Sequence, residues 1–407
     1  MKIDEPLSEK KGNHFHRYLN YATSILSEYN GDEPFHIFLK KFFSANKKHG
    51  SRDRKLITSL CYNFFRLGYA VSPNVDMQRS LILAFFLIEQ ESSAFLENLK
   101  PEWNAKIRLD ISSKLKMVEK FFSAEKIFSF PEELSDSINT NQYARSFLIQ
   151  PKLFIRIRPG KKNSVFDKLK SANISFNKMS ETCLALANNE KVSEIINIDK
   201  EVVIQDYNSQ RTLDTVIKHH SFSGSSISIW DCCAASGGKS ILAFDLLKNI
   251  ELTVSDTRKS ILEILKKRFA KAHILNYNCF VADLSTSTKQ QISSGKYDLL
   301  IADVPCSGSG TWARTPEKLH FFHTDKIKEY SILQKEIVSN AAKCLVEDGL
   351  LLYITCSVFK KENEENVDFF KTNLNLLLLE TGYLKGYEIR ADTMFVALFK
   401  KQAVIDI

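Results

Sequence analysis

Apolar residues recur three or four positions apart through the first third of the chain. Two early stretches show this spacing, with apolar positions at Tyr18, Ala22, Ile25 and Leu26, and then at Phe35, Phe38, Leu39, Phe42 and Phe43. Such spacing gives a helix one apolar face, and the run Asp53–Tyr69 shows it again. Residues 14–125 are therefore predicted to be mostly helical.

The pattern changes near Phe130-Pro131, where shorter apolar runs begin. The strands expected next are Leu153–Ile157, Leu184–Ala187 and Val202–Gln205. Apolar and polar residues alternate in the first of them, which predicts one apolar face and places Arg156 and Arg158 on the other. Residues 131–215 are therefore predicted to form a small α/β module.

From about Ser225 onward, apolar strands alternate with amphipathic helices. The expected strands are Ile227–Trp230, Leu252–Ser255, Asn278–Val281, Leu299–Ala302 and Leu350–Thr355, followed by a last pair at Tyr387–Arg390 and Met394–Lys400. This alternation predicts a mostly parallel, doubly wound sheet, which binds ligands at the carboxyl ends of its strands. We expect three domains, at residues 1–130, 131–215 and 216–407.

Composition adds few constraints to this picture. The chain has 407 residues, of which 44% are hydrophobic, and a net charge of +8. This charge suits a polyanionic partner as well as a solvated, lysine-rich surface, and the same alternatives hold for Lys47, Lys48, Arg52, Arg54 and Lys55 beside the third predicted helix. No Cys-x-x-Cys pair occurs among the eight cysteines, so we expect no metal site. A polar start and the lack of a membrane-length apolar run predict a cytoplasmic protein with free thiols.

A glycine-rich turn follows the first strand of the predicted sheet. It reads Cys233-Ala-Ala-Ser-Gly-Gly-Lys239, and Gly237 and Gly238 would let the backbone approach a ligand at the start of the next helix. It is neither a Walker loop nor a G-x-G-x-x-G fingerprint. By itself, such a turn is equally well a tight connection without a ligand.

Three successive strands of this sheet end on acidic residues, Asp231, Asp256 and Asp283. Asp256 lies where nucleotide-binding sheets place a carboxylate for the ribose hydroxyls, although an Asp there also makes a good helix N-cap. Asp283 can accept a hydrogen bond from an adenine amine or can simply stabilise a turn. Together around one Gly-Gly turn, the three carboxylates favour a bound adenosine cofactor.

Two cysteines follow the next two strands. Asp303 ends the fourth strand, Pro305 stiffens the turn that presents Cys306, and the two glycines after it allow a planar group to approach. Cys356 ends the fifth strand. A lone cysteine is usually a small buried apolar residue, but two at the ends of neighbouring strands over a cofactor site favour a chemical role.

These motifs, in this order, resemble the RsmB/Nop/Sun family of RNA cytosine-C5 methyltransferases. The runs that carry the resemblance are CAASGGK, DTR, the Asp283 strand end, DVPCSGSGTWARTPE and YITCSVFKKENEEN, within the last 180 or so residues. Upstream, Pro151–Pro159 and Val203–Ser209 resemble the family's small RNA-binding module. The N-terminal helices are similar to the NusB-like RNA-binding domain of the bacterial ribosomal-RNA members.

The resemblance implies a fold and a reaction. The fold would comprise an all-helical NusB-like N-terminal domain, a small α/β RNA-binding module, and a C-terminal Rossmann-like S-adenosylmethionine-dependent methyltransferase domain. The enzyme would act as a monomer with S-adenosyl-L-methionine as cofactor and RNA as partner, and its substrate would be small-subunit ribosomal RNA. Open alternatives are methylation of transfer RNA or DNA, and a catalytically silent ribosome-assembly protein that binds RNA.

The resemblance also implies a role for each site residue. Cys356 would attack C6 of cytosine, Cys306 would assist release, Asp303 would hydrogen-bond the base, and Lys239 would lie close to the base. The implied cofactor-binding residues are Cys233, Ala234, Ala235, Ser236, Gly237, Gly238, Lys239, Asp256, Arg258, Asp283 and Asp303. Ser236 stands where the family usually has proline, and Ala313 where a second basic residue is common.

The chemistry explains why a cysteine is needed. C5 of cytosine is a weak nucleophile until a thiolate adds to C6 and N3 receives a hydrogen bond. After methyl transfer, the C5 proton leaves and the thiolate is eliminated. Spacing alone does not choose between Cys356 and Cys306, because the DNA cytosine-C5 enzymes use a Pro-Cys cysteine like Cys306.

Overall fold

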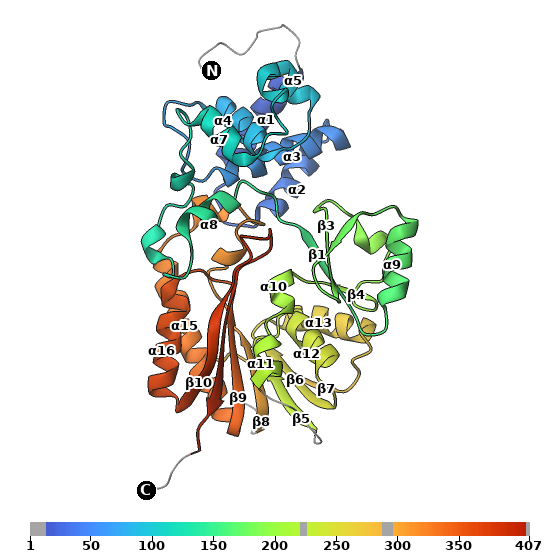
Figure 1. The fold of residues 1–407 in the computed structure, drawn as a ribbon, viewed down its shortest axis with the longest axis vertical. Coiled ribbons are helices and arrows are strands. Elements are labelled where there is room, and N and C mark those ends of the chain that lie inside the picture. The colour runs from blue at the N-terminus through green and yellow to red at the C-terminus, as the bar shows by residue number, and fades with distance from the viewer. Residues whose placement is uncertain (1–13, 220–225, 287–295, 404–407) are drawn as a thin grey trace. The chain divides into compact units, whose positions relative to one another are not determined.

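The computed structural model describes residues 14–219, 226–286 and 296–403 (Figure 1). The first thirteen residues of the expected 1–130 domain therefore lie outside the described residues, as do 220–225, 287–295 and 404–407 of the expected 216–407 domain. The chain divides into two compact units. The first comprises residues up to Glu132 together with Asn139–Gln150 and Trp312–His323, and the second comprises Glu133–Ile138, Pro151–Thr311 and the residues from Thr324 onward.

The first unit is helical, as the apolar spacing predicted for residues 14–125. Its helices are α1 His14–Glu28, α2 Phe35–Ala45, α3 Ser51–Arg66, α4 Met77–Ile88, α5 Ala94–Leu99, α6 Pro101–Asn104, α7 Ile111–Val118, α8 Thr140–Ser146 and α14 Lys318–Phe321, with the short 3-10 turn η1 Ala124–Lys126. Helix α4 is buried from Ser80 to Ile88, which fits its unbroken apolar sequence. The side chain of Asp76 caps its first turn.

A segment from the C-terminal part of the chain belongs to this helical unit. Residues Trp312–His323 lie inside the expected 216–407 range, yet they pack among the N-terminal helices. The Phe321 ring lies 5.1 Å from that of Tyr29, and a Cβ added to Gly31 would come within 2.6 Å of it. The ring of Trp312 lies 6.2 Å from that of Phe130.

The second unit begins with a small antiparallel sheet in the strand order β2-β3-β1-β4. Its elements are β1 Leu153–Ile157, β2 Phe176–Lys178, β3 Cys183–Leu186, β4 Val202–Ile204, the helix α9 Lys162–Ser171 and the turn η3 Val192–Glu194, while the turn η2 Pro131–Glu133 includes the sequence boundary between the two units. The three strands expected here are confirmed. Arg156 and Arg158 are only 4% and 8% exposed, so the face that was expected to carry them is covered.

A seven-stranded sheet follows in the order β10-β11-β9-β8-β5-β6-β7. Its strands are β5 Ile227–Asp231, β6 Ile250–Asp256, β7 Tyr277–Val281, β8 Tyr297–Asp303, β9 Leu345–Thr355, β10 Leu376–Leu384 and β11 Met394–Lys401. Strands β5 to β9 are parallel to one another, whereas β11 pairs antiparallel with both β9 and β10. Because β5 lies between β6 and β8, the strand order reverses there, and such a switch point is where doubly wound sheets bind ligands.

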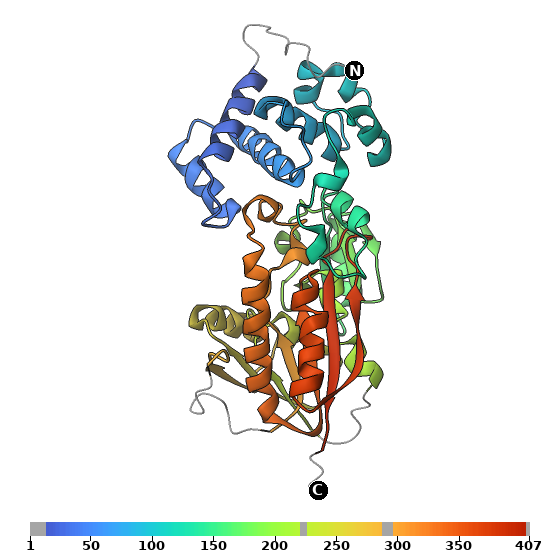
Figure 2. The ribbon, with the colours of Figure 1, turned by 90° about the vertical axis from the view of Figure 1, so that its left-hand side faces the viewer.

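Helices cover both faces of this sheet, as its buried parallel strands require. They are α10 Tyr207–Gln210, α11 Asp214–His219, α12 Gly238–Leu246, α13 Lys259–Lys271, α15 Asp325–Ala341 and α16 Glu364–Asn373, with short turns at η4 Ser309–Thr311, η5 Ala342–Cys344 and η6 Lys360–Glu362. Figure 2 shows α15 and α16 side by side along one face, where Val338 and Phe370 pack against Tyr353 of β9. On the other face, Ile241 of α12 and Leu265 of α13 join a second core cluster.

One expected strand is wrong. Tyr387–Arg390 forms a turn, and the antiparallel partner of β11 is β10. The carbonyl of Gly386 accepts hydrogen bonds from the backbone N–H groups of Ile389 and Ala391, and Arg390 has a left-handed φ of 64°. These local bonds close the segment on itself, which prevents ladder pairing. Among the residues that the structure describes, no helix has the length and apolar character to cross a membrane.

Candidate active site

The expected site residues gather at the carboxyl edge of the large sheet. Strand β5 ends at Asp231, β6 at Asp256 and β8 at Asp303. In the register of the sheet, Asp231 pairs with Val254 and Ile301, while Asp303 pairs with Ile354, two residues before Cys356. Parallel strands therefore bring residues that lie far apart in sequence to one edge.

The glycine-rich turn is held in an unusual backbone conformation. Ala235 and Gly237 have left-handed φ angles of 45° and 84°. A Cβ added to Gly237 would come within 2.6 Å of the Phe269 ring, whereas none of the described residues comes within 4 Å of one added to Gly238. Gly237 is therefore required by the fold, while Gly238 leaves open space at the start of α12, where backbone N–H groups point outward.

Asp256 fastens this turn to the next strand. Its Oδ2 accepts a hydrogen bond from the Ala235 backbone N–H at 3.0 Å, and its Oδ1 accepts from the backbone N–H and the Nε of Arg258 at 2.9 and 3.0 Å. The side chain of Arg258 therefore binds the carboxylate of Asp256.

Asp283 is exposed just beyond β7. It accepts hydrogen bonds from the backbone N–H and the hydroxyl of Ser285, so it stabilises a turn at the same edge.

Asp231 lies beneath the turn. Its side chain is fully buried, and its Oδ2 accepts a hydrogen bond from Ser240 Oγ at 2.6 Å. Burial raises the pKa of this carboxyl to about 7, with Asp303 raising it further and Lys239 opposing the shift. Asp231 therefore supports the glycine-rich turn through Ser240.

Lys239 and Asp303 form an ion pair across the switch point. The Nζ of Lys239 donates to Asp303 Oδ2 and to Ser209 Oγ, both at 2.9 Å. Lys239 is 7% exposed, whereas the Asp303 side chain is 31% exposed, so the lysine is shielded from water and the carboxylate stays partly accessible. The sequence indicated no role for Ser209, although it lies at the end of the run Val203–Ser209 that carried part of the resemblance.

The two cysteines meet over the ends of β8 and β9. Their Sγ atoms are 3.2 Å apart, and the backbone N–H of Cys356 donates to the sulfur of Cys306 at 3.4 Å. Hydrogen bonding with Cys356, and then burial, raise the pKa of the Cys306 thiol well above its ordinary value. The two thiols are therefore close enough to share a hydrogen bond.

The two glycines after Cys306 shape and pack their loop, whereas the sequence predicted that they allow a planar group to approach. A Cβ on Gly310 would come within 2.1 Å of the Thr393 carbonyl oxygen, and the Gly310 N–H donates to the Cys356 carbonyl at 2.8 Å. Gly310 therefore allows the loop to pack against neighbouring backbone, rather than making room for a planar group. Gly308 has a left-handed φ of 72° and shapes the turn itself.

A buried carboxylate lies behind both cysteines. Glu362 is 0% exposed and accepts hydrogen bonds from the Ser307 backbone N–H at 2.9 Å and from Ser357 Oγ at 2.7 Å. Gln334 Nε2 donates to the same side chain at 2.9 Å. Because Ser307 and Ser357 each follow one of the cysteines, a single carboxylate holds both loops. Burial raises its pKa.

The sequence pattern did not indicate this role for Glu362. It lies in the charged run KKENEEN, which has the composition of a solvated helix. The available signal was its position, six residues after Cys356 and next to a strand end. Burial of one acidic residue within such a run can be recognised only once the loop has folded over it.

The fold and the site together define a class of protein domain. A doubly wound sheet with an antiparallel last strand pair, a glycine-rich turn after its first parallel strand and acidic ends on the next ones is a Rossmann-like methyltransferase domain. Residues 223–399 match the family model of the 16S rRNA methyltransferases RsmB/F. The match covers the C-terminal part of the chain, which is thus similar to that family.

Curated methyltransferases are similar to part of this chain. The ribosomal RNA small subunit methyltransferase B of Shewanella oneidensis is 30% identical over 146 residues, 35% of this chain and 33% of that protein. The probable enzyme of the same name from Bacillus subtilis is 26% identical over 234 residues, 56% and 50% of the two chains. A mouse 28S rRNA (cytosine-C(5))-methyltransferase is 28% identical over 39% of this chain and 20% of its own length. The matched region thus spans half or less of each of these relatives.

Solved structures share the fold. A protein solved as PH0851 aligns with a TM-score of 0.68 at 19% identity, over 95% of this chain and 98% of its own. NSun6 from Pyrococcus horikoshii, solved with SFG, aligns with a TM-score of 0.57 at 16% identity, over 69% and 97% of the two chains. At these identities, the likeness establishes the architecture.

Proposed function

We propose that this chain is an S-adenosylmethionine-dependent RNA methyltransferase that forms 5-methylcytidine through a covalent bond between Cys356 and C6 of cytosine. The observation that carries the proposal is the pair of thiols 3.2 Å apart at the ends of β8 and β9. They share the carboxyl edge of the sheet with the Lys239–Asp303 ion pair and the glycine-rich turn. The family that the C-terminal part of the chain matches supports the same reaction class.

The residues present suit S-adenosylmethionine. The turn from Cys233 to Gly238 would hold it over the open space at Gly238, with Asp256 toward the ribose and Asp283 toward the adenine. The first N–H groups of α12 receive no side-chain cap from the described residues, so they are free to bind the cofactor's carboxylate. When bound, S-adenosylmethionine supplies the electrophilic methyl group.

The two cysteines divide the remaining chemistry. The family resemblance assigns the role of nucleophile to Cys356, and Cys306, whose sulfur lies 3.2 Å away, can hydrogen-bond to it. Its thiolate would add to C6 while N3 takes up a proton through Asp303 and Lys239 balances the charge, which makes C5 an enamine carbon. C5 would then take the methyl group of S-adenosylmethionine, with S-adenosylhomocysteine as the leaving group. A base accepts the C5 proton, and the C6–S bond breaks to return the thiolate as N3 gives up its proton. Cys306 lies within reach to assist that release.

Small-subunit ribosomal RNA is the proposed substrate. The names of the matching family and of the bacterial relatives support it, as does the positive net charge. We also propose that the helical first unit is NusB-like and binds RNA. Arg156 and Arg158 are buried in ion pairs, so RNA contacts of the small module would come from its other basic residues. We further infer a monomer that works in the cytoplasm.

The experiment is methyl transfer from labelled S-adenosylmethionine to total RNA from cells that lack this protein, followed by sizing and nucleoside analysis. We expect label in 5-methylcytidine of small-subunit ribosomal RNA. Label confined to transfer RNA would overturn the substrate assignment. Measurable cofactor binding without label in any RNA, including assembling small subunits, would overturn the enzymatic role and leave an RNA-binding assembly factor.

A further inference from the structure

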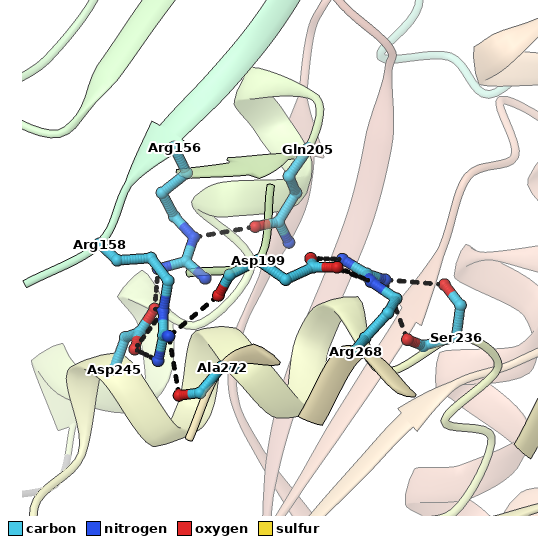
Figure 3. Close-up of polar contacts among 8 residues, drawn as sticks. All are labelled: Arg156, Arg158, Asp199, Gln205, Ser236, Asp245, Arg268 and Ala272. Atoms are coloured by element: carbon cyan, nitrogen blue, oxygen red, sulfur yellow. Dashed lines mark hydrogen bonds and ion pairs between the residues drawn. The ribbon is translucent and has the colours of Figure 1, made fainter. Parts of the chain in front are cut away.

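A network of buried charges lies between the small module and the methyltransferase sheet (Figure 3). Asp245 of α12 is 3% exposed, and its carboxylate receives both arginines of the small module. Arg156 donates to it at 2.5 Å, and Arg158 donates through Nη2 at 2.7 Å. Arg158 also donates to the backbone oxygens of Asp199 and Ala272. These contacts fix the small module against α12 and the end of α13.

The same network continues to the glycine-rich turn. Arg268 of α13 directs one edge of its guanidinium at the carboxylate of Asp199, with Nη2 at 2.8 Å and Nε at 3.0 Å. Its Nη1 donates to both the backbone oxygen and the hydroxyl of Ser236, each at 2.9 Å. Figure 3 shows Arg268 lying between the two residues. The planar guanidinium therefore links the small module to the cofactor turn, a geometry that a lysine could not reproduce.

Ser236 is the point where this turn most needs support. Its neighbours Ala235 and Gly237 are both in the left-handed region, and such a conformation for alanine persists only where surrounding contacts determine it. On one side, Asp256 accepts from the Ala235 N–H. On the other side, Arg268 donates to Ser236. The turn is thus held from both sides, and one of the two supports depends on a residue outside the methyltransferase domain.

We propose that Asp199 and Arg268 are positioning residues for cofactor binding, and that the small module is in this way a structural part of the S-adenosylmethionine site. Asp199 orients Arg268, and Arg268 holds the Ser236 turn in the conformation that receives the cofactor. Asp199 itself is 4% exposed with a left-handed φ of 67°, so its carboxylate is presented by a constrained loop. This inference rests on the cofactor-binding part of the proposed function.

The test compares dissociation constants for S-adenosylmethionine, measured by titration calorimetry on the full chain. Arg268→Gln and Asp199→Asn should each raise the dissociation constant by roughly tenfold. Without the support of Arg268, part of the binding free energy must order the turn, and the measured affinity falls. Arg268→Lys should give a similar loss, since it keeps the charge but cannot contact Ser236 and Asp199 together. At saturating cofactor, methyl transfer by these variants should approach the wild-type rate.

Two control variants separate positioning from loss of stability. Val165→Ala removes volume from the core of the small module without touching the network, and Lys162→Gln breaks an exposed ion pair of the same module. Both should bind the cofactor as the wild type does, although the first should unfold at a lower temperature. If Val165→Ala weakens binding as much as Arg268→Gln, general destabilisation explains the effect and the proposal fails.

A third readout needs no cofactor. In the free protein, amide hydrogen exchange across residues 234–238 should be faster in Arg268→Gln and in Asp199→Asn than in the wild type, and the double variant should exchange like either single one. Unchanged exchange and unchanged affinity would overturn the inference. Failure of the wild type to bind S-adenosylmethionine would instead overturn the proposed function, so the two failures are distinguishable.

Discussion

The two halves of the active-site edge are supported in different ways. On the β5–β6 side, the cofactor turn is held by charged groups from distant parts of the chain, and Arg268 remains 19% exposed. On the β8–β9 side, the cysteine loops converge on Glu362, which is 0% exposed and lies six residues after Cys356. Partly hydrated ion pairs leave a turn able to adjust as a ligand enters and leaves, whereas a buried carboxylate fixes the two cysteine sulfurs at one separation.

This contrast predicts that substitutions on the two sides change different quantities. The largest effect is expected for Cys356→Ala, which should lower methyl transfer by about 10⁴-fold or more because no other group can form the bond to C6. The dissociation constant for S-adenosylmethionine should not change. Single-turnover methyl transfer and calorimetry measure the two quantities, with Cys279→Ala on β7 as the matched cysteine control. Wild-type turnover by Cys356→Ala would contradict this assignment and would give the role of nucleophile to Cys306.

Removal of the second sulfur should block a later step. In Cys306→Ala, the bond to C6 can form but its release loses an acid–base partner, so turnover should fall by roughly 10²-fold. A denaturant-resistant protein–RNA band should accumulate when RNA and cofactor are both present. The double variant Cys306→Ala/Cys356→Ala provides the control and should show no band. Absence of the band in the single variant would refute the release role.

Glu362→Gln tests the support of the cysteine side directly. The amide keeps the volume but cannot accept from Ser307, Ser357 and Gln334 together, so the two loops should shift and the rate at saturating substrates should fall by about 10²-fold. The pH dependence of the rate should shift with it, while cofactor affinity stays unchanged. Glu365→Gln, on the exposed face of α16, is the control. If Glu362→Gln weakened cofactor binding without changing the rate, the proposed contrast between the β5–β6 side and the β8–β9 side would be wrong.

The smallest effect on the reaction is expected for Asp231, whose influence is on stability. Its folded pKa of about 7 lies above the ordinary value of 3.8, so the folded state binds more protons than the unfolded state between these limits. The contribution of Asp231 to the free energy of unfolding should therefore fall by at most about 4 kcal/mol as pH rises from about 4 to 7, and it should level off above pH 7.

Asp231→Asn provides the measurement. Relative to the wild type, it should lose that part of the pH dependence, visible as a smaller change in the unfolding midpoint of the cofactor-free protein between pH 5 and pH 8. Its Oδ1 can still accept from Ser240, so the turn should remain supported. Identical pH profiles for the two proteins would show that Asp231 is ionised throughout this range.

The sequence by itself determined the strand ends and therefore most of the site. Parallel strands bring their carboxyl ends to one edge, so a pattern of apolar runs followed by Asp231, Asp256, Asp303 or Cys356 was sufficient to place these residues together. The helical start of the chain and the strands of the small module also followed from local periodicity, because side-chain spacing decides which face is buried.

Only the tertiary structure decided which partners the remaining residues found. Arg156 and Arg158 were expected on the polar face of a strand, yet both are buried and pair with Asp245, 89 and 87 positions away. Glu362 lies in a charged run whose composition is typical of a solvated helix, yet it is buried. The partner strand of β11 was predicted in the wrong place because the chain forms a turn at Gly386. Burial and ion pairing depend on which distant surfaces meet, and local periodicity holds no information about that meeting.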